Sequence, residues 1–222
     1  MNNNSIIRVN NLVKSYNNEA LNALNGVSFS IRTGEVLSLM GPSGSGKSTL
    51  LNLLSTIDVP TTGDIWFDGK KSTAYKPYDR FRAETIGFVF QFHHLLSHLT
   101  LLENIELPMY SIESGKAKRR KRAEFLLDKV GLAAKQHSFP NRISGGERQL
   151  TAIARALANN PKLIIADEPT GSVDTRTGAM IIDYLIHHCT ANNLTMIIAT
   201  HNNDIAKKTH RIIHLENGLI KE

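Results

Sequence analysis

Residues 41–48 combine glycines, a lysine and a hydroxyl at a spacing that can hold a phosphate group. The run Gly-Pro-Ser-Gly-Ser-Gly-Lys-Ser matches the pattern G-x-x-x-x-G-K-[ST] at every position. Glycines let backbone N–H groups curl around a β-phosphate, Lys47 brings a positive charge to the β- and γ-phosphates, and the Ser48 hydroxyl can ligate Mg²⁺. A glycine-rich turn that binds nothing is the alternative, but a predicted strand before the run and a predicted helix after it favour a nucleotide site.

Two carboxylates follow a short apolar run. Asp167 and Glu168 stand directly after 163–166, which predicts a strand buried on both faces. Ligands bind at the carboxyl edge of an open α/β sheet, so both side chains are expected there. Asp167 is placed to hold Mg²⁺ through water, and Glu168 to polarise a water for attack on the γ-phosphate. A solvated pair that caps a helix is the alternative, and the phosphate-binding run favours the catalytic reading.

The elements that must position these groups are predicted from hydrophobic periodicity and capping signals. Thr100 with Glu103, and Ser144 with Glu147, have the spacing of capping boxes that begin helices. Strands are expected at 27–31, 36–40, 65–67, 86–90, 163–166, 196–199 and 213–215, and helices at 50–57, 100–108, 118–130, 144–157 and 181–186. Strands at both ends and helices in the middle predict an α/β core that carries a helical lobe.

Composition bounds the class of protein. With 222 residues, 41% hydrophobic and 21% charged, the chain can bury a sizeable core and is not expected to be disordered. A run of about 18 apolar residues is missing, which excludes a spanning helix, and the first residues do not resemble a signal peptide, so we expect a cytoplasmic chain. Cys189 is the only cysteine, which excludes an internal disulfide. The net charge of +6 permits an anionic partner without choosing one.

Four further features resemble the ABC ATPases. The sequence Ile-Ser-Gly-Gly-Glu at 143–147 resembles the signature of that family, and 172–174 follows Glu168 at the spacing of the family's D-loop. His201 closes a predicted buried strand like the switch histidine, and Gln91 ends another like the Q-loop glutamine. The resemblance covers nearly the whole chain. The small residues at the start of the signature helix also make physical sense as a second anion site, because a bare helix N-terminus presents N–H donors.

The resemblance implies a role for each matching residue. Catalysis is assigned to Glu168, His201 and Lys47, and Mg²⁺ to Ser48, Gln91 and Asp167. Tyr16 resembles the aromatic residue that stacks on adenine, with an ordinary strand tyrosine as the alternative. ATP binding is assigned to Tyr16, Gly41, Pro42, Ser43, Gly44, Ser45, Gly46, Lys47, Ser48, Thr49 and Gln91. In a head-to-tail dimer that sandwiches two ATP molecules, the opposite subunit would contribute Ser144, Gly145, Gly146, Glu147 and the D-loop residue Asp174.

The family also implies a fold. We expect an α/β P-loop NTPase (RecA-like) core with an N-terminal antiparallel β subdomain and an inserted α-helical subdomain. The whole of 1–222 would be one nucleotide-binding domain, with 1–91 and 159–222 as the core and 92–158 as the helical part. The sequence departs from the usual pattern at Ile143, Leu150, Asn202 and Ser172-Val173. None of these departures removes a phosphate or Mg²⁺ ligand, so activity is expected to survive.

Residues 91–100 are similar to the lipoprotein-releasing (LolD-type) and macrolide-exporter (MacB-type) branch of the transporters. The resemblance implies an ATPase motor, peripheral on the cytoplasmic face of the inner membrane, that energises a permease with four membrane helices and a large extracytoplasmic domain. Lipoprotein release is expected; macrolide or peptide efflux, with a periplasmic adaptor, is the alternative. A soluble ABC ATPase acting on nucleic acid is disfavoured by the single phosphate loop and the short span between Gln91 and Ser144, so no nucleic-acid partner is expected.

The sequence allows two interpretations of each of two surface features. Phe92, the pair His93-His94 and Leu95 are expected to contact the permease, with plain structural histidines as the alternative. The basic run 116–122 is interpreted as a solvated helix start, with anionic lipid headgroups as the other reading. Residues 76–83 have no interpretation from the sequence, which also does not reveal the cargo.

Overall fold

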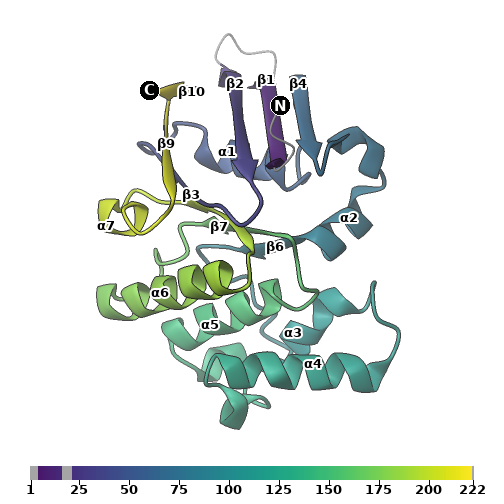
Figure 1. Cartoon of the computed structure of the whole chain (residues 1–222). Helices are drawn as coiled ribbons and strands as arrows, with labels where there is room; N and C mark the ends of the chain where they lie inside the picture. Colours follow the sequence, from purple (N-terminus) through teal and green to yellow (C-terminus); the bar gives the residue numbers. More distant parts are fainter. Residues whose placement is uncertain (1–4, 17–21, 222) are drawn as a thin grey trace. The chain divides into compact units, whose positions relative to one another are not determined.

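A computed structural model describes residues 5–16 and 22–221 and divides the chain into two compact units (Figure 1). Unit 1 comprises Met1–Tyr78 and His188–Glu222, and unit 2 comprises Asp79–His187. Strands and helices are mixed in both, which confirms the expected α/β class. Within the described residues, no helix is both long enough and apolar enough to cross a membrane. The boundaries predicted at 91/92 and 158/159 stay a prediction.

An antiparallel sheet forms the first part of unit 1, as expected for the N-terminal β subdomain. Its order is β2-β1-β4-β5, and each neighbouring pair is antiparallel. Val27 and Ile31 on β2 are buried while the intervening Ser28 and Ser30 are exposed, which is the period-two pattern of a half-buried strand. The strands are β1 (Ser5–Ser15), β2 (Asn22–Arg32), β4 (Thr62–Phe67) and β5 (Lys70–Lys71).

Parallel strands form the second part of unit 1. In the order β10-β9-β3-β8, β3 runs parallel to both β9 and β8, and β10 closes a hairpin on β9 through Asn217-Gly218. Every residue of β3 and β8 is buried, as parallel strands require. These elements are β3 (Val36–Met40), β8 (Thr195–Ala199), β9 (Arg211–Glu216) and β10 (Leu219–Lys221), with the helices α1 (Lys47–Leu54), η1 (Ser72–Tyr75) and α7 (Asn203–Ala206).

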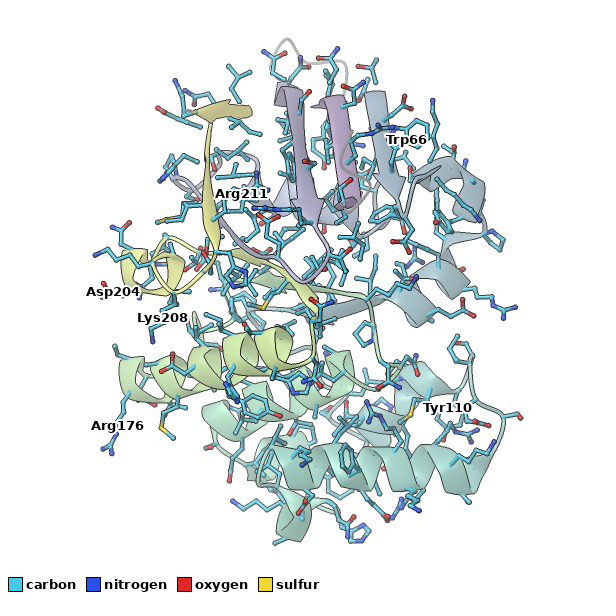
Figure 2. The ribbon with its side chains drawn as sticks, in the orientation of Figure 1. Trp66, Tyr110, Arg176, Asp204, Lys208 and Arg211 are labelled. Atoms are coloured by element: carbon cyan, nitrogen blue, oxygen red, sulfur yellow. The ribbon has the colours of Figure 1, made fainter. Side chains whose placement is uncertain are left out.

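Arg211 ties separate strands of unit 1 together (Figure 2). Its Nε donates to Glu35 Oε1 at 2.7 Å, and its guanidinium also donates to the carbonyl of Ser30 on β2. Glu35 is buried and in turn accepts from the Arg32 backbone N–H at 2.8 Å. A buried carboxylate with these partners fixes the turn that leads into β3, and β3 leads into the phosphate loop.

Unit 2 contains two parallel strands and a helical group. α5 packs on β6, and α3, α4 and α5 pack on one another (Figure 1). The strands are β6 (Ile86–Val89) and β7 (Leu163–Asp167). The helices are α2 (Tyr78–Thr85), α3 (Leu101–Glu106), η2 (Leu107–Met109), α4 (Lys116–Lys129), η3 (Ala133–Lys135), η4 (Pro140–Arg142), α5 (Gly145–Ala156) and α6 (Thr175–Ala191). The first residue of α2 and the last turn of α6, from His188, belong to unit 1. The segment that the sequence left uninterpreted holds a cis Lys76–Pro77 bond and most of α2.

Both predicted capping boxes are present. Thr100 accepts from the Glu103 backbone N–H and Ser144 from the Glu147 backbone N–H, while each glutamate reaches back to the N-cap amide. Two donors at each helix start are thereby satisfied locally. Asn104, which is fully buried, fixes the loop before α3 by accepting from the Leu96 N–H at 2.7 Å and donating to three carbonyls.

Candidate functional site

The phosphate loop connects β3 to α1 and is closed against the backbone of unit 1. A Cβ placed on Gly41 would lie 2.0 Å from the Leu215 carbonyl oxygen, and one on Gly46 would lie 2.4 Å from the Ala23 carbonyl oxygen. Gly46 is also the N-cap of α1, with a left-handed φ of 102°. Any side chain at these two positions would displace the loop, so the chain needs glycine there to form the cradle.

Lys47 lies across this cradle. Its Nζ donates to the carbonyl oxygens of Gly41 at 2.8 Å and Pro42 at 2.9 Å. The Ser45 hydroxyl is buried and has no hydrogen-bond partner in the described residues, while Ser48 is exposed on the first turn of α1. A phosphate group fits these residues, because the ammonium can exchange its carbonyl partners for phosphate oxygens at a helix N-terminus. The Ser48 hydroxyl fits Mg²⁺ as one oxygen ligand.

Tyr16 lies beside α1 as a half-exposed platform. Its hydroxyl donates to Asp58 Oδ2 at 2.9 Å and interacts with the Thr49 side chain, while Lys14 Nζ lies 4.8 Å from the ring centroid. Burial, followed by the bond to Asp58, raises the pKa of Tyr16. Burial raises the pKa of Asp58, but the opposing hydrogen bond from Lys14 (2.7 Å) and those from Val59 and Tyr16 leave it below its usual value. The phenol is therefore neutral, and its hydrogen bond to Asp58 fixes the position of the ring.

His201 reaches the same edge of the parallel strands as the phosphate loop. Leu39 on β3 is the register partner of Ala199 on β8, and the Thr200 N–H donates to the Leu39 carbonyl at 3.1 Å. His201 thus lies across from the first loop residue, Gly41. The departure at Asn202 is accommodated, because its Oδ1 accepts from the Asp204 N–H at 2.8 Å as the N-cap of α7.

In unit 2, Gln91 and the two carboxylates share an edge in the same way. Val89 on β6 is the register partner of Ala166 on β7, so Gln91 and Glu168 each stand two residues beyond this last pair. The Gln91 amide lies so close to Gly171 that a Cβ there would be 2.5 Å from Nε2. Glu168 has a positive φ of 45°, a strained backbone that is typical of functional positions, and its carbonyl accepts from the Gly171 N–H at 3.0 Å.

The signature turn packs against the predicted D-loop. A Cβ on Gly145 would lie 3.4 Å from the Ser172 carbonyl oxygen, and one on Gly146 would lie 2.5 Å from Thr177 Cγ2. Glu147 pairs with Lys135 at 2.5 Å, and this bond, followed by the Ser144 amide, lowers the pKa of Glu147. Asp174 accepts from the Thr177 N–H at 3.0 Å; its hydrogen bonds to Thr177 lower the pKa of its carboxyl group.

The structure therefore assembles the predicted site residues into two groups, one on each unit. Unit 1 holds Tyr16, the loop residues Gly41 to Thr49, and His201. Unit 2 holds Gln91, Ser144, Gly145, Gly146, Glu147, Asp167, Glu168 and Asp174. The sequence reading missed the residues that fix these groups, namely Lys14, Asp58 and Arg155. For Arg155 the sequence did carry a signal, because a charged residue stands there among the apolar residues of α5.

The prediction that both histidines of the pair face a permease is wrong for His93. Its side chain is 8% exposed, whereas Phe92 beside it is 68% exposed. His94 is exposed and lines, with Phe90, Arg155 and ten other residues of unit 2, an open cavity of about 430 Å³.

The basic run at the start of α4 is partly engaged within unit 2. Arg122 donates to the carbonyls of Leu157 (3.0 Å) and Ala158 (3.2 Å) and to the side chain of Asn160 (2.6 Å). Arg119 is buried, lies 4.2 Å from the Tyr110 ring centroid and donates to the Glu113 carbonyl (Figure 2 labels Tyr110). These contacts of Arg119 and Arg122 fix the position of α4. Fewer positive charges of the basic run 116–122 are therefore available to contact lipid headgroups.

Comparisons with known proteins agree with this geometry. A family model described as ABC transporter matches residues 24–171. The uncharacterized ABC transporter ATP-binding protein MJ1508 of Methanocaldococcus jannaschii is 44% identical over 202 residues, covering 90% of each chain. The lipoprotein-releasing system ATP-binding protein LolD 2 of Chlorobaculum tepidum is 42% identical over 221 residues, covering 95% of this chain and 89% of that protein.

Solved structures give the same family. The ATP-binding cassette MJ0796, described as a dimer in a post-hydrolysis state bound to ADP and Pi, has a TM-score of 0.89 and 39% identity, with 97% of each chain covered. A second dimeric structure of MJ0796, described as a bacterial ABC transporter cassette, has the same TM-score and 40% identity.

Proposed function

The chain belongs to the ABC transporter family as an ATP-hydrolysing subunit that uses ATP with Mg²⁺, and we propose that it powers a permease of the lipoprotein-releasing type from the cytoplasmic face of the inner membrane. The observation that carries the nucleotide part of this proposal is the cradle at Gly41 and Gly46 with Lys47 lying across it. The transport part depends on the similarity to lipoprotein-releasing proteins and on an exposed surface of unit 2.

We assign nucleotide binding to the group on unit 1. Loop amides and the N-terminus of α1 would hold the phosphates, and Lys47 would leave the Gly41 and Pro42 carbonyls to bind the β- and γ-phosphates. Tyr16 would stack on adenine, since Asp58 and Lys14 hold its ring beside Thr49. His201 would contact the γ-phosphate from the end of β8.

We assign hydrolysis to the carboxylates on unit 2. Glu168 would accept a proton from the attacking water, a role worth about 10²–10⁴-fold in rate. Asp167, Ser48 and Gln91 would hold Mg²⁺, which when bound neutralises charge that develops on the phosphates. The strained backbone of Glu168 supports this role, because strain at one residue persists only where the surroundings determine it.

We propose that two copies form an ATP sandwich, with the signature turn of one copy facing the phosphate loop of the other. The capping box at Ser144 leaves small residues and free helix N–H groups at the start of α5, which suits a γ-phosphate. Two structures of the similar cassette MJ0796 are described as dimeric. Asp174 would lie at the same interface, as the resemblance implies.

For the permease, we propose the exposed surface around Phe92 and Leu95. Phe92 is 68% exposed, and large exposed apolar side chains mark interaction sites when they adjoin a groove. His94, two residues on, lines the open cavity of unit 2. A loop of a permease that carries an amphipathic helix has the chemistry to fill this surface.

Reconstitution tests the cargo. The chain would be purified with the permease encoded beside it, and release of a lipoprotein from the bilayer would be measured with ATP and with Glu168→Gln as the inactive control. ATP-dependent release supports the proposal. Efflux of a macrolide or peptide without lipoprotein release would replace it with the exporter function, and a periplasmic adaptor encoded nearby would point the same way.

A further inference from the structure

The side chain of His93 lies where three segments of unit 2 meet. Its Nε2 is 3.1 Å from the Ser172 hydroxyl, in the segment that follows Glu168. The imidazole also interacts with the backbone of Gly145, in the signature turn. His93 itself stands two residues after Gln91 and belongs to the segment that follows β6. Its buried side chain contacts two other segments, the D-loop segment (172–174) and the signature turn (143–147).

The backbone at this point is strained and is held by α5. His93 and His94 have positive φ angles of 58° and 47°, a conformation that non-glycine residues adopt rarely. Arg155 donates to both carbonyls, from Nη2 to His93 and from Nη1 to His94, each at 2.6 Å. Arg155 is half-buried, and burial lowers the pKa of its guanidinium. The His93–His94 turn is therefore fixed to α5 by its backbone and to Ser172 by its side chain.

The groups around His93 are positive. Arg148 and Arg155 of α5 contribute charge there, and burial, followed by the Arg148 charge, lowers the pKa of His93. At neutral pH the imidazole is therefore uncharged, with one ring nitrogen a donor and the other an acceptor. A protonated His93 would offer only donors beside two arginines.

We propose that His93 is a positioning residue that joins the turn after Gln91, the signature turn and the D-loop segment into one body. This proposal rests on the ATP-sandwich dimer proposed above. Ser144 and Asp174 must reach the second copy together, and His93 fixes the spacing between their two segments. Loss of the link would weaken closure of the dimer while leaving nucleotide binding at Lys47 and Tyr16 in the open monomer unchanged.

The experiment compares His93→Leu, His93→Gln and Ser172→Ala, each in the Glu168→Gln background, with His137→Asn as an exposed histidine control from the same unit. Leu and Gln are equally disfavoured at positive φ, but only Gln places an amide where Nε2 stands. Two properties are measured: ATP-driven dimerisation by sedimentation, and amide hydrogen exchange of 144–148 and 172–174 in the ATP-bound monomer.

We expect His93→Leu to weaken dimerisation about 2- to 10-fold, which corresponds to one lost hydrogen bond, with ATP affinity unchanged. Exchange in both segments should rise, Gln should restore most of the difference, and Ser172→Ala should add little to His93→Leu.

Unchanged exchange in both segments for His93→Leu would overturn the inference, as would full additivity with Ser172→Ala. If the parent stays monomeric at saturating ATP, the sandwich proposal is wrong, and the exchange data still decide whether His93 links the segments. A fall in ATP affinity equal to the fall in dimerisation would also refute the positioning role, because the damage would then extend to unit 1.

Discussion

Replacing Lys47 by alanine tests the cradle most directly. In the free protein the Lys47 ammonium makes two hydrogen bonds, to Gly41 O (2.8 Å) and Pro42 O (2.9 Å), and both would be exchanged for phosphate contacts on ATP binding. The net gain is therefore one charge-assisted interaction of about 1.5–3 kcal/mol rather than its full strength in isolation. We expect the dissociation constant for Mg-ATP to rise about 10- to 150-fold.

Titration calorimetry of the purified chain measures this change directly. The Pro42 carbonyl lies on an exposed residue and can bind water when the ammonium is removed, so the free energy of unfolding should change by about 0.5 kcal/mol or less. Lys70→Ala, an exposed lysine on β5, is the matched control and should bind ATP like the wild type. A Lys47→Ala variant with normal folding and normal ATP affinity would refute the reasoning.

Three further changes test other parts of the argument. Glu168→Gln should retain ATP binding and lower kcat about 10²–10⁴-fold, as a phosphate-release assay would measure; undiminished hydrolysis would place the general base elsewhere. Phe92→Ala and Leu95→Ala should each reduce co-purification of the permease with nucleotide affinity unchanged, whereas a normal subunit ratio would remove this surface from the proposal. Arg122→Ala takes three hydrogen bonds from the end of α5, and urea unfolding should show a loss of about 1–3 kcal/mol; a loss within error would mean that water replaces the guanidinium.

Local sequence was sufficient where the chemistry is contiguous. The phosphate loop, the Asp167-Glu168 pair and both capping boxes each occupy a few consecutive residues, and a strand or helix on either side fixes their geometry. The buried parallel strands β7 and β8 were predicted for the same reason, because the unbroken apolar runs 163–166 and 196–199 have no polar face to expose.

Charge and histidine patterns were less informative. In the sequence the basic run of α4 is a single cluster of positive charges. In the helix, Arg119 and Arg122 point inward and donate to carbonyls 6 and 36 residues away. His93 and His94 are adjacent and alike in type, yet one is buried against Ser172 and the other lines an open cavity. A left-handed turn separates them, and the sequence showed no glycine or asparagine there to predict it.

The sequence by itself determined that this chain binds a nucleoside triphosphate and hydrolyses it, because the required residue types are read from short motifs whose backbone geometry is local. Tertiary structure decided which side chains support those motifs: Asp58 under Tyr16, Arg155 on the turn after Gln91, and His93 against Ser172. These partners lie 42 to 79 residues apart. Their meeting depends on strand order and helix packing, which no local pattern encodes.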